Sequence, residues 1–215
     1  MKKLLIIGAN GMLGHKLCSE LSHDFDVNGT IRSPSDTLSK ILPSSVVLHS
    51  NINILDFKSL EKLISDLQPD VIINCAGVIK QSDAASDIKK LYDVNAEFPK
   101  KLASYCLENK IYCIHFSTDC VFDGLKGSPY TEKDASTAKD DYGKSKYQGE
   151  ISNDYCLTLR TSIVGRELLR HKSLFDWVFS QKGKTLKGFH NALYTGLTTL
   201  EMAKFLKWLL NENLN

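Results

Sequence analysis

The feature that most constrains the fold is an apolar run that leads straight into a glycine-rich turn near the amino terminus. Residues 4–7 are all leucine or isoleucine, and Gly8, Gly11 and Gly14 follow them directly. Apolar residues then recur at helical spacing, at Leu17, Cys18 and Leu21. The pattern predicts a buried strand, a tight turn and a helix whose first N–H groups can hold a pyrophosphate. The three glycines alone also fit an ordinary turn, but this placement favours a dinucleotide site.

The rest of the chain alternates apolar runs with helical patterns. We expect further strands at residues 27–32, 45–49, 70–77, 111–116 and 155–163. Helical patterns cover residues 56–67, residues 87–109 and a stretch that begins near Asp141, whereas residues 33–45 read as a loop. Asp56 is the expected N-cap of the first of these helices and Pro69 closes it, while Pro99 is expected to bend or break the longer one.

This alternation predicts the fold class. Continuous apolar character at residues 70–77 indicates a sheet covered on both faces. Repeated strands and helices with short links indicate parallel strands, right-handed crossovers and a doubly wound sheet. We therefore expect an α/β protein with a Rossmann sheet, in which residues 1–165 form the dinucleotide-binding domain. Beyond it we expect a helix near residues 174–179, a short strand or turn at 184–188, and an amphipathic helix at 200–210 with Met202, Phe205, Leu206 and Leu209 on its apolar side.

Composition excludes several classes of function. The chain has 215 residues and a net charge of +2 without a basic block, so neither nucleic acid nor an anionic membrane surface is an expected partner. The first apolar run is too short for a signal peptide, and no stretch approaches membrane-spanning length. The six cysteines form no C-x-x-C pair and the six histidines lack ligand spacing. We therefore expect reduced cysteines, a cytoplasmic location and no metal site.

A second pattern points to proton chemistry. Tyr142 and Lys146 are four residues apart in a predicted helix, so they share a face and the ammonium can favour ionisation of the phenol. The pair alone is common by chance and also fits a solvated helix face. Its place is more informative, because the helix follows the strand that ends at Ser117 and Thr118, where sheets of this class bind ligands.

Together these patterns resemble the extended short-chain dehydrogenase/reductase family, in the branch of the dTDP-4-dehydrorhamnose reductases and related nucleotide-sugar reductases. The matching stretches follow the family's order and run through most of the chain, at residues 8–14, 74–77, 94–96, 117–124, 142–146 with 149–150, and 159–162. The resemblance implies NADPH-dependent reduction of a keto group on a nucleotide-linked sugar, in the synthesis of cell-surface polysaccharide precursors such as capsule or O-antigen.

The resemblance also implies roles for individual residues. Tyr142 would give a proton to the carbonyl oxygen of the substrate, and Thr118 would hydrogen-bond the same oxygen. Lys146 would hold the nicotinamide ribose and lower the pKa of the phenol. Asp119 would join Thr118 in contacting the substrate. The catalytic set is therefore Thr118, Tyr142 and Lys146.

The implied cofactor site draws on the ends of several strands. Its residues are Gly8, Asn10, Gly11, Met12 and Leu13, of which the last three face the pyrophosphate, then Asn53 and Ile54 at the adenine, Ala76 and Gly77 at the ribose, and Tyr142 and Lys146. Asn53 stands where relatives usually carry aspartate. Arg32, just after the second strand, offers a cation for a 2′-phosphate, so we expect NADPH, with NADH as the alternative. An exposed surface arginine is the other interpretation of Arg32.

Two departures from the family concern the substrate. Cys120 stands where rhamnose-forming reductases usually have tyrosine, and Ile163 where they have tryptophan. Nucleotide-sugar dehydratases usually have glutamate at the position of Cys120, so their reaction is disfavoured. A keto-sugar reductase of different specificity fits best. A nucleotide-sugar 4-epimerase and a non-catalytic NADP-binding module are the alternatives.

The carboxyl-terminal part of the chain leads us to expect a partner chain. Family members normally continue through further elements of the sugar-nucleotide domain, so residues 166–215 are expected to form a partial substrate-binding region. A second copy or a partner chain would then complete that region. Residues 1–215 alone are expected to bind NADPH but to hold sugar nucleotides weakly, and to leave an apolar patch exposed.

Overall fold

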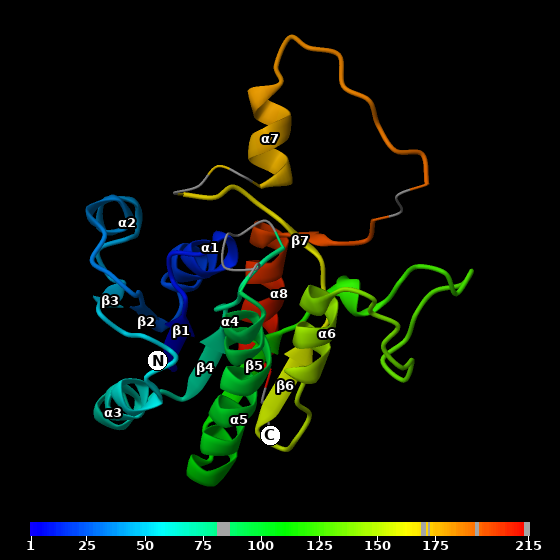
Figure 1. The fold of residues 1–215 in the computed structure, drawn as a ribbon. Helices are drawn as coiled ribbons and strands as arrows, with labels where there is room; N and C mark the ends of the chain where they lie inside the picture. Colours follow the sequence, from blue (N-terminus) through cyan, green and yellow to red (C-terminus); the bar gives the residue numbers. More distant parts are fainter. Residues whose placement is uncertain (81–86, 169–170, 172, 192–193, 213–215) are drawn as a thin grey trace.

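The computed structural model describes residues 1–80, 87–168, 171, 173–191 and 194–212. Its centre is a six-stranded parallel sheet in the order β3-β2-β1-β4-β5-β6 (Figure 1). The strands are β1 (Lys3–Ile7), β2 (Asp26–Thr30), β3 (Val47–His49), β4 (Val71–Asn74), β5 (Tyr112–Phe116) and β6 (Cys156–Leu159). This order is that of the doubly wound Rossmann sheet. The predicted fold class is confirmed.

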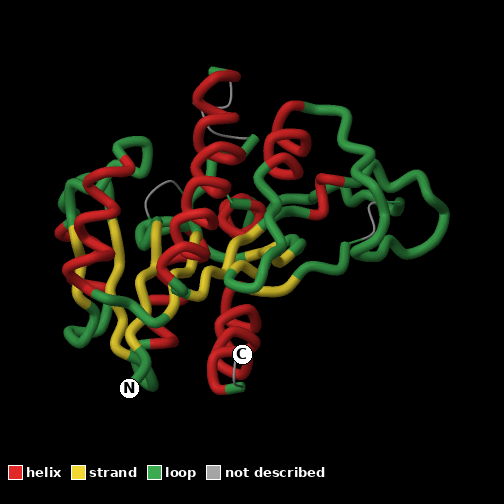
Figure 2. The backbone as a smooth tube through the Cα atoms, turned by 90° about the horizontal axis from the view of Figure 1, so that it is seen from below, coloured by secondary structure: helices red, strands yellow, loops and turns green. Residues whose placement is uncertain are grey.

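Helices cover both faces of the sheet, as Figure 2 shows. They are α1 (Met12–Leu21), α2 (Asp36–Ile41), α3 (Phe57–Leu67), α4 (Ile88–Tyr92), α5 (Phe98–Asn109), α6 (Asp141–Gln148), α7 (Leu174–Ser180) and α8 (Thr199–Asn211). Leu4 and Ile6 of β1 pack in a cluster with α1 and α8, whereas Leu5 and Ile7 pack with α3 and α5. Successive strand residues point to opposite faces, so a wholly apolar strand requires cover on both.

Three elements differ from the sequence expectation. The expected loop at residues 33–45 contains α2, because the Ser35 hydroxyl accepts from the Leu38 N–H at 3.3 Å and the Leu38 side chain is buried. The strand expected to reach Ile163 ends at Leu159; Ile163 belongs to β7 (Ile163–Val164), which pairs with β8 (Leu197–Thr198) in a separate sheet. Residues 184–188 form neither strand nor helix.

The long helix expected at residues 87–109 is interrupted before Pro99. A π-helical turn, η2 (Asp93–Glu97), separates α4 from α5, and its last bond runs from the Phe98 N–H to the Asp93 carbonyl. Proline has no N–H to give to the Asn95 carbonyl four residues earlier, which explains the break at this position. A side chain at Gly149 would run into that same carbonyl, so the chain after α6 passes close to the π-helical turn.

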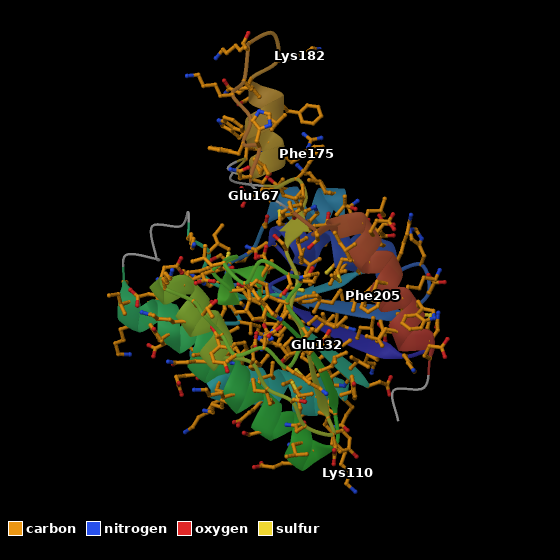
Figure 3. All side chains as sticks on the ribbon, turned by 90° about the vertical axis from the view of Figure 1, so that its right-hand side faces the viewer. Lys110, Glu132, Glu167, Phe175, Lys182 and Phe205 are labelled. Atoms are coloured by element: carbon orange, nitrogen blue, oxygen red, sulfur yellow. The ribbon has the colours of Figure 1, made fainter. Side chains whose placement is uncertain are left out.

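The carboxyl-terminal helix α8 packs against α1 and shares the core of the sheet. Its buried residues include Met202, Ala203, Leu206 and Leu210. Phe205, expected on the apolar side, is instead exposed on the outer surface (Figure 3). The structure thus places α8 with the sheet, and the assignment of residues 166–215 to substrate binding stays a prediction.

Helix α7 stands beyond the carboxyl ends of the strands, and residues 181–191 lead away from it in a wide loop (Figure 1). None of its residues, all of which the structure describes, is buried. Phe175 and Phe179 contact each other with ring centroids 4.7 Å apart. Among the described residues, no helix is both long and apolar enough to cross a membrane.

Candidate active site at the carboxyl edge of the sheet

The structure brings the predicted site residues to one edge of the sheet. Parallel strands place their carboxyl ends on a common edge, where doubly wound folds bind ligands. Residues 8–13 follow β1, Arg32 follows β2, Asn53 and Ile54 follow β3, Ala76 and Gly77 follow β4, Thr118 and Asp119 follow β5, and Tyr142 and Lys146 lie on α6. Their proximity is a structural finding, whereas their individual roles remain predictions.

The glycine turn has a geometry that other residues cannot easily adopt. Gly8 has φ of +83°, and a Cβ there would lie 3.1 Å from the Ala76 nitrogen. A Cβ on Gly14 would run into the Gly8 carbonyl, which already accepts from the Gly11 N–H at 3.0 Å. The first and third glycines therefore bring helix α1 close to the end of β1.

The amino end of α1 offers a place for a phosphate group. Gly11 is its N-cap, and no described side chain caps the helix. The N–H groups of the first turn have no partner within a helix, so those of Met12 and Leu13 are available to an anion. Asn10 lies exposed at the tip of the turn. These features fit a dinucleotide pyrophosphate.

Tyr142 and Thr118 meet between α6 and the end of β5. The buried Thr118 hydroxyl donates to Asp119 Oδ1 at 3.1 Å and accepts from the Cys120 N–H at 3.2 Å, and it lies beside the Tyr142 phenol. Burial raises the pKa of Tyr142 to about 12; the Thr118 hydroxyl opposes that rise, and Asp119 and Asp140 add to it. The phenol pKa thus lies above its ordinary value because burial is the largest influence on it, and the expected lowering by Lys146 stays a prediction.

Lys146 points toward the sheet. Its Nζ donates to the Phe116 carbonyl at 2.6 Å and lies 4.0 Å from where a Cβ on Gly77 would stand. Burial lowers the pKa of Lys146 from 10.5 to about 8, against the opposing charge of Glu150. Tyr142 and Lys146 share one face of α6, as predicted, but their polar groups have different partners.

A charged pair that the sequence pattern did not single out, Lys80 and Asp140, lies beside the Tyr142 ring. Lys80 Nζ lies 2.5 Å from Asp140 Oδ2 and 5.9 Å from the centroid of the Tyr142 ring. Asp140 in turn caps α6, because its carboxylate accepts from the Gly143 N–H at 2.7 Å. With Leu91 and Asp141 these residues line an open hollow of about 400 Å³. Sixty positions separate the lysine from the aspartate, so no local signal could have paired them.

A second hollow, of about 350 Å³, lies at the amino ends of β4 and β5 between α3 and α5. It is lined by residues such as Gln68, Asp70 and Asn109 and contains none of the predicted site residues. We assign the candidate site to the carboxyl edge because Tyr142, Lys146 and the uncapped amino end of α1 lie there.

Asn95 joins the loop after β4 to α6. Its Oδ1 accepts from the Val78 N–H at 2.8 Å, and its Nδ2 donates to the Val78 carbonyl at 3.0 Å and to Ser145 Oγ at 3.2 Å. The side chain is fully buried in the π-helical turn. Asn95 thus holds the segment after Gly77 against the helix that carries Tyr142 and Lys146.

The predicted adenine and 2′-phosphate residues lie farther along the edge. Asn53 is exposed, and its Oδ1 accepts from the Leu55 N–H at 3.2 Å, which commits that oxygen to the turn before α3. Ile54 is half-buried, and Arg32 is exposed two residues after β2. In the part of the chain that is described, no group of three His, Cys, Asp or Glu side chains could hold a metal ion.

Comparison with known proteins places this site in a family. A family model described as the RmlD substrate binding domain matches residues 1–200. The dTDP-4-dehydrorhamnose reductase of Burkholderia thailandensis is 30% identical over 182 residues, which are 85% of this chain and 52% of that protein. Methionine adenosyltransferase 2 subunit beta of Mus musculus is 32% identical over 69% of this chain and 42% of its own length. The chain thus spans about half the length of these curated relatives.

Solved structures give the same relationship. A hypothetical dTDP-4-dehydrorhamnose reductase from Sulfolobus tokodaii is 30% identical with a TM-score of 0.79, over 98% of this chain and 72% of that one. A dTDP-4-dehydrorhamnose reductase from Bacillus anthracis in complex with NADP is 20% identical with a TM-score of 0.78, over 100% of this chain and 73% of that one, which shows the shared fold. These matches confirm the resemblance drawn from the sequence.

Proposed function

The chain belongs to the RmlD substrate binding domain family, and we propose that it uses NADPH to reduce a keto group on a nucleotide-linked sugar, in the synthesis of cell-surface polysaccharide precursors. One observation carries the proposal. Thr118, Tyr142 and Lys146 lie together at the carboxyl edge of the sheet. The glycine turn and the amino end of α1, which offer a site for phosphate, lie at the same edge. A proton donor and a cofactor cradle together are what carbonyl reduction requires.

Tyr142 is suited to giving a proton. With a pKa of about 12 the phenol is protonated at neutral pH, so it can donate to the substrate oxygen as negative charge develops there. The hydroxyl of Thr118, fixed by the Cys120 N–H, orients the same oxygen. When bound, the reduced nicotinamide would supply the hydride. The open hollow beside the ring gives Tyr142 access to solvent for reprotonation.

Lys146 supplies a positive charge at the centre of the site. With a pKa of about 8 the ammonium is mostly charged at neutral pH, and its remaining N–H groups can bind the hydroxyls of a ribose near Gly77. The same charge would stabilise the oxyanion that forms as the carbonyl is reduced.

Arg32 and the relatives support NADPH as the cofactor. The guanidinium of Arg32, two residues after β2, would bind the 2′-phosphate, since this is the strand whose end meets the adenosine ribose in such folds. The related Bacillus anthracis structure was solved with NADP. We place the reaction in the cytoplasm, since the cysteines are all free, as reduced cysteines are in that compartment.

A cofactor-binding subunit without catalysis is the second candidate. It is favoured by the relative named as a subunit of methionine adenosyltransferase 2. A nucleotide-sugar 4-epimerase, which would use the same tyrosine and lysine, is the other enzyme alternative.

Turnover of a panel of nucleotide-linked 4-keto sugars with NADPH tests the proposal. We expect at least one sugar to be reduced by the wild-type chain and not by Tyr142→Phe, with NADPH bound equally by both. Tight NADPH binding without turnover of any sugar would favour the binding subunit. Turnover that survives Tyr142→Phe would remove the assignment of the proton donor.

A further inference from the structure

A half-buried charged network lies behind the candidate catalytic residues. Ser117 Oγ donates to Glu150 Oε1 at 2.6 Å, and Arg160 donates to both oxygens of Glu150 through Nε and Nη2 at 2.7–3.0 Å. The Glu150 side chain is 13% exposed and that of Arg160 22%. Ser117 follows β5, Glu150 follows α6 and Arg160 follows β6. The network therefore joins the carboxyl ends of two strands to the end of α6.

Close packing holds Glu150 and Arg160 in place. Gly149 passes against the Asn95 carbonyl where no side chain would fit, which sets the direction of the chain at Glu150. The Arg160 guanidinium lies over the rings of Phe122 and Tyr147, with its central carbon 5.2 and 5.9 Å from their centroids. A bidentate guanidinium that also stacks on aromatic rings has little freedom to move.

The network acts on the residues that form the candidate site. Ser117 lies between Phe116, whose carbonyl receives the Lys146 ammonium, and Thr118, which contacts Tyr142. A shift of Ser117 would therefore move the partners of both α6 residues. Glu150 is also four residues beyond Lys146, and its charge opposes the effect of burial on that lysine.

The charge of Glu150 favours the charged form of Lys146, although the ion-pair partner of Glu150 is Arg160. Three titratable groups act on Lys146: Cys75 after the end of β4, His115 from β5 and Glu150 after the end of α6. Burial raises the pKa of the Cys75 thiol well above its usual value and lowers the pKa of His115 well below its own, so both are neutral at neutral pH. Of these three groups, the Glu150 carboxylate is the one that carries charge.

We propose that Glu150 is a positioning residue, which fixes the segment 116–118 against α6 and keeps Lys146 in its charged form within the sheet. Arg160 holds Glu150 for this task. The proposal rests on the proposed function in that Thr118 and Lys146 serve catalysis there. An ion pair that merely stabilises the fold would leave the charge state of Lys146 unchanged when it is removed.

Direct titration of Lys146 by NMR tests the proposal without any sugar substrate. The chain is labelled with ¹³C-lysine, and the Lys146 signal is identified by its loss in Lys146→Met. Glu150→Gln keeps an acceptor for Ser117 but removes the charge, and we expect it to lower the titration midpoint of Lys146 by about one pH unit or more. Glu97→Gln, which removes a charge from the exposed Lys100–Glu97 pair, is the matched control and should leave the midpoint unchanged.

A second variant tests the proposal if Glu150→Gln does not fold. Glu150→Gln leaves Arg160 without its ion partner, and an unpaired buried charge is strongly destabilising. Glu150→Gln combined with Arg160→Met removes both charges and should fold with a lowered midpoint, by less than in Glu150→Gln because the Arg160 cation is removed as well. An unchanged midpoint in a folded Glu150 variant overturns the proposal. A lowered midpoint in a chain that reduces no sugar supports the positioning of Lys146 and refutes the proposed reaction instead.

Discussion

Replacing Lys146 with methionine is expected to stabilise the chain while it removes the proposed ribose contact. Lys146 is 7% exposed, and burial lowers its pKa from 10.5 to about 8. Because one pKa unit corresponds to about 1.4 kcal/mol, keeping this charge buried at neutral pH costs the folded state about 3 kcal/mol. Methionine has a similar length and carries no charge, so the variant does not bear that cost.

The gain is reduced by a lost hydrogen bond. Methionine cannot donate to the Phe116 carbonyl, which Lys146 Nζ reaches at 2.6 Å. A buried carbonyl without a partner costs about 1–3 kcal/mol. We therefore expect a net stabilisation of about 1–2 kcal/mol at neutral pH, which raises Tm by roughly 2–8 °C in a chain of this size.

The difference depends on pH with a definite sign. The folded pKa of Lys146 lies below the unfolded value, so the unfolded chain binds more protons between the two, and the wild type gains stability as the pH rises from about 8 to 10.5. Below that window both states are protonated and the cost is constant. The advantage of Lys146→Met should be largest at neutral pH, disappear before pH 10 and then reverse, because the lost hydrogen bond to the Phe116 carbonyl remains.

Thermal unfolding followed by circular dichroism at both pH values provides the measurement. Lys144→Met is the matched control, because Lys144 is an exposed lysine on the same helix, and it should change stability by no more than about 0.5 kcal/mol. A Lys146→Met chain that melts below the wild type at neutral pH, with a difference that does not change with pH, would refute the cost assigned to the buried ammonium.

Three further substitutions probe the site. Tyr142→Phe should lower kcat by about 10²–10⁴ with an unchanged Kd for NADPH, because only proton donation is lost; turnover and fluorescence titration measure the two. Arg32→Ala should weaken NADPH binding about tenfold or more, through the loss of a charge-assisted contact worth about 1.5–3 kcal/mol, and leave NADH binding unchanged; equal affinity of the wild type for both cofactors would contradict the role of Arg32. Gly14→Ala should lower Tm and NADPH affinity together, because the added Cβ runs into the Gly8 carbonyl and overpacking costs about 1–3 kcal/mol, whereas Gly188→Ala, which meets no atom within 4 Å, should change neither.

The sequence was sufficient for the architecture because the relevant signals are local. The apolar run at residues 4–7, the glycines after it and the apolar residues 70–77 each report on their own strand and its cover, and parallel strands then bring the ends of β1 to β5 to one edge. For the same reason Thr118, Tyr142 and Lys146 could be selected from sequence, as the end of one strand and one face of the next helix. Helix α2 was missed because a single capping serine and one buried leucine make a weak pattern.

Only the tertiary structure decided what each side chain faces. The apolar side of α8 was expected to include Phe205, but α1 packs where Ala203 and Leu210 lie, and the phenylalanine stays outside. The pKa of Tyr142 rises because the phenol is buried and because the nearby carboxylates of Asp119 and Asp140 disfavour its ionised form. Lys146, one helical turn along, donates to the Phe116 carbonyl instead. Periodicity places residues on a face of a helix, but burial and electrostatic fields depend on segments far apart in the chain, which meet only when it folds.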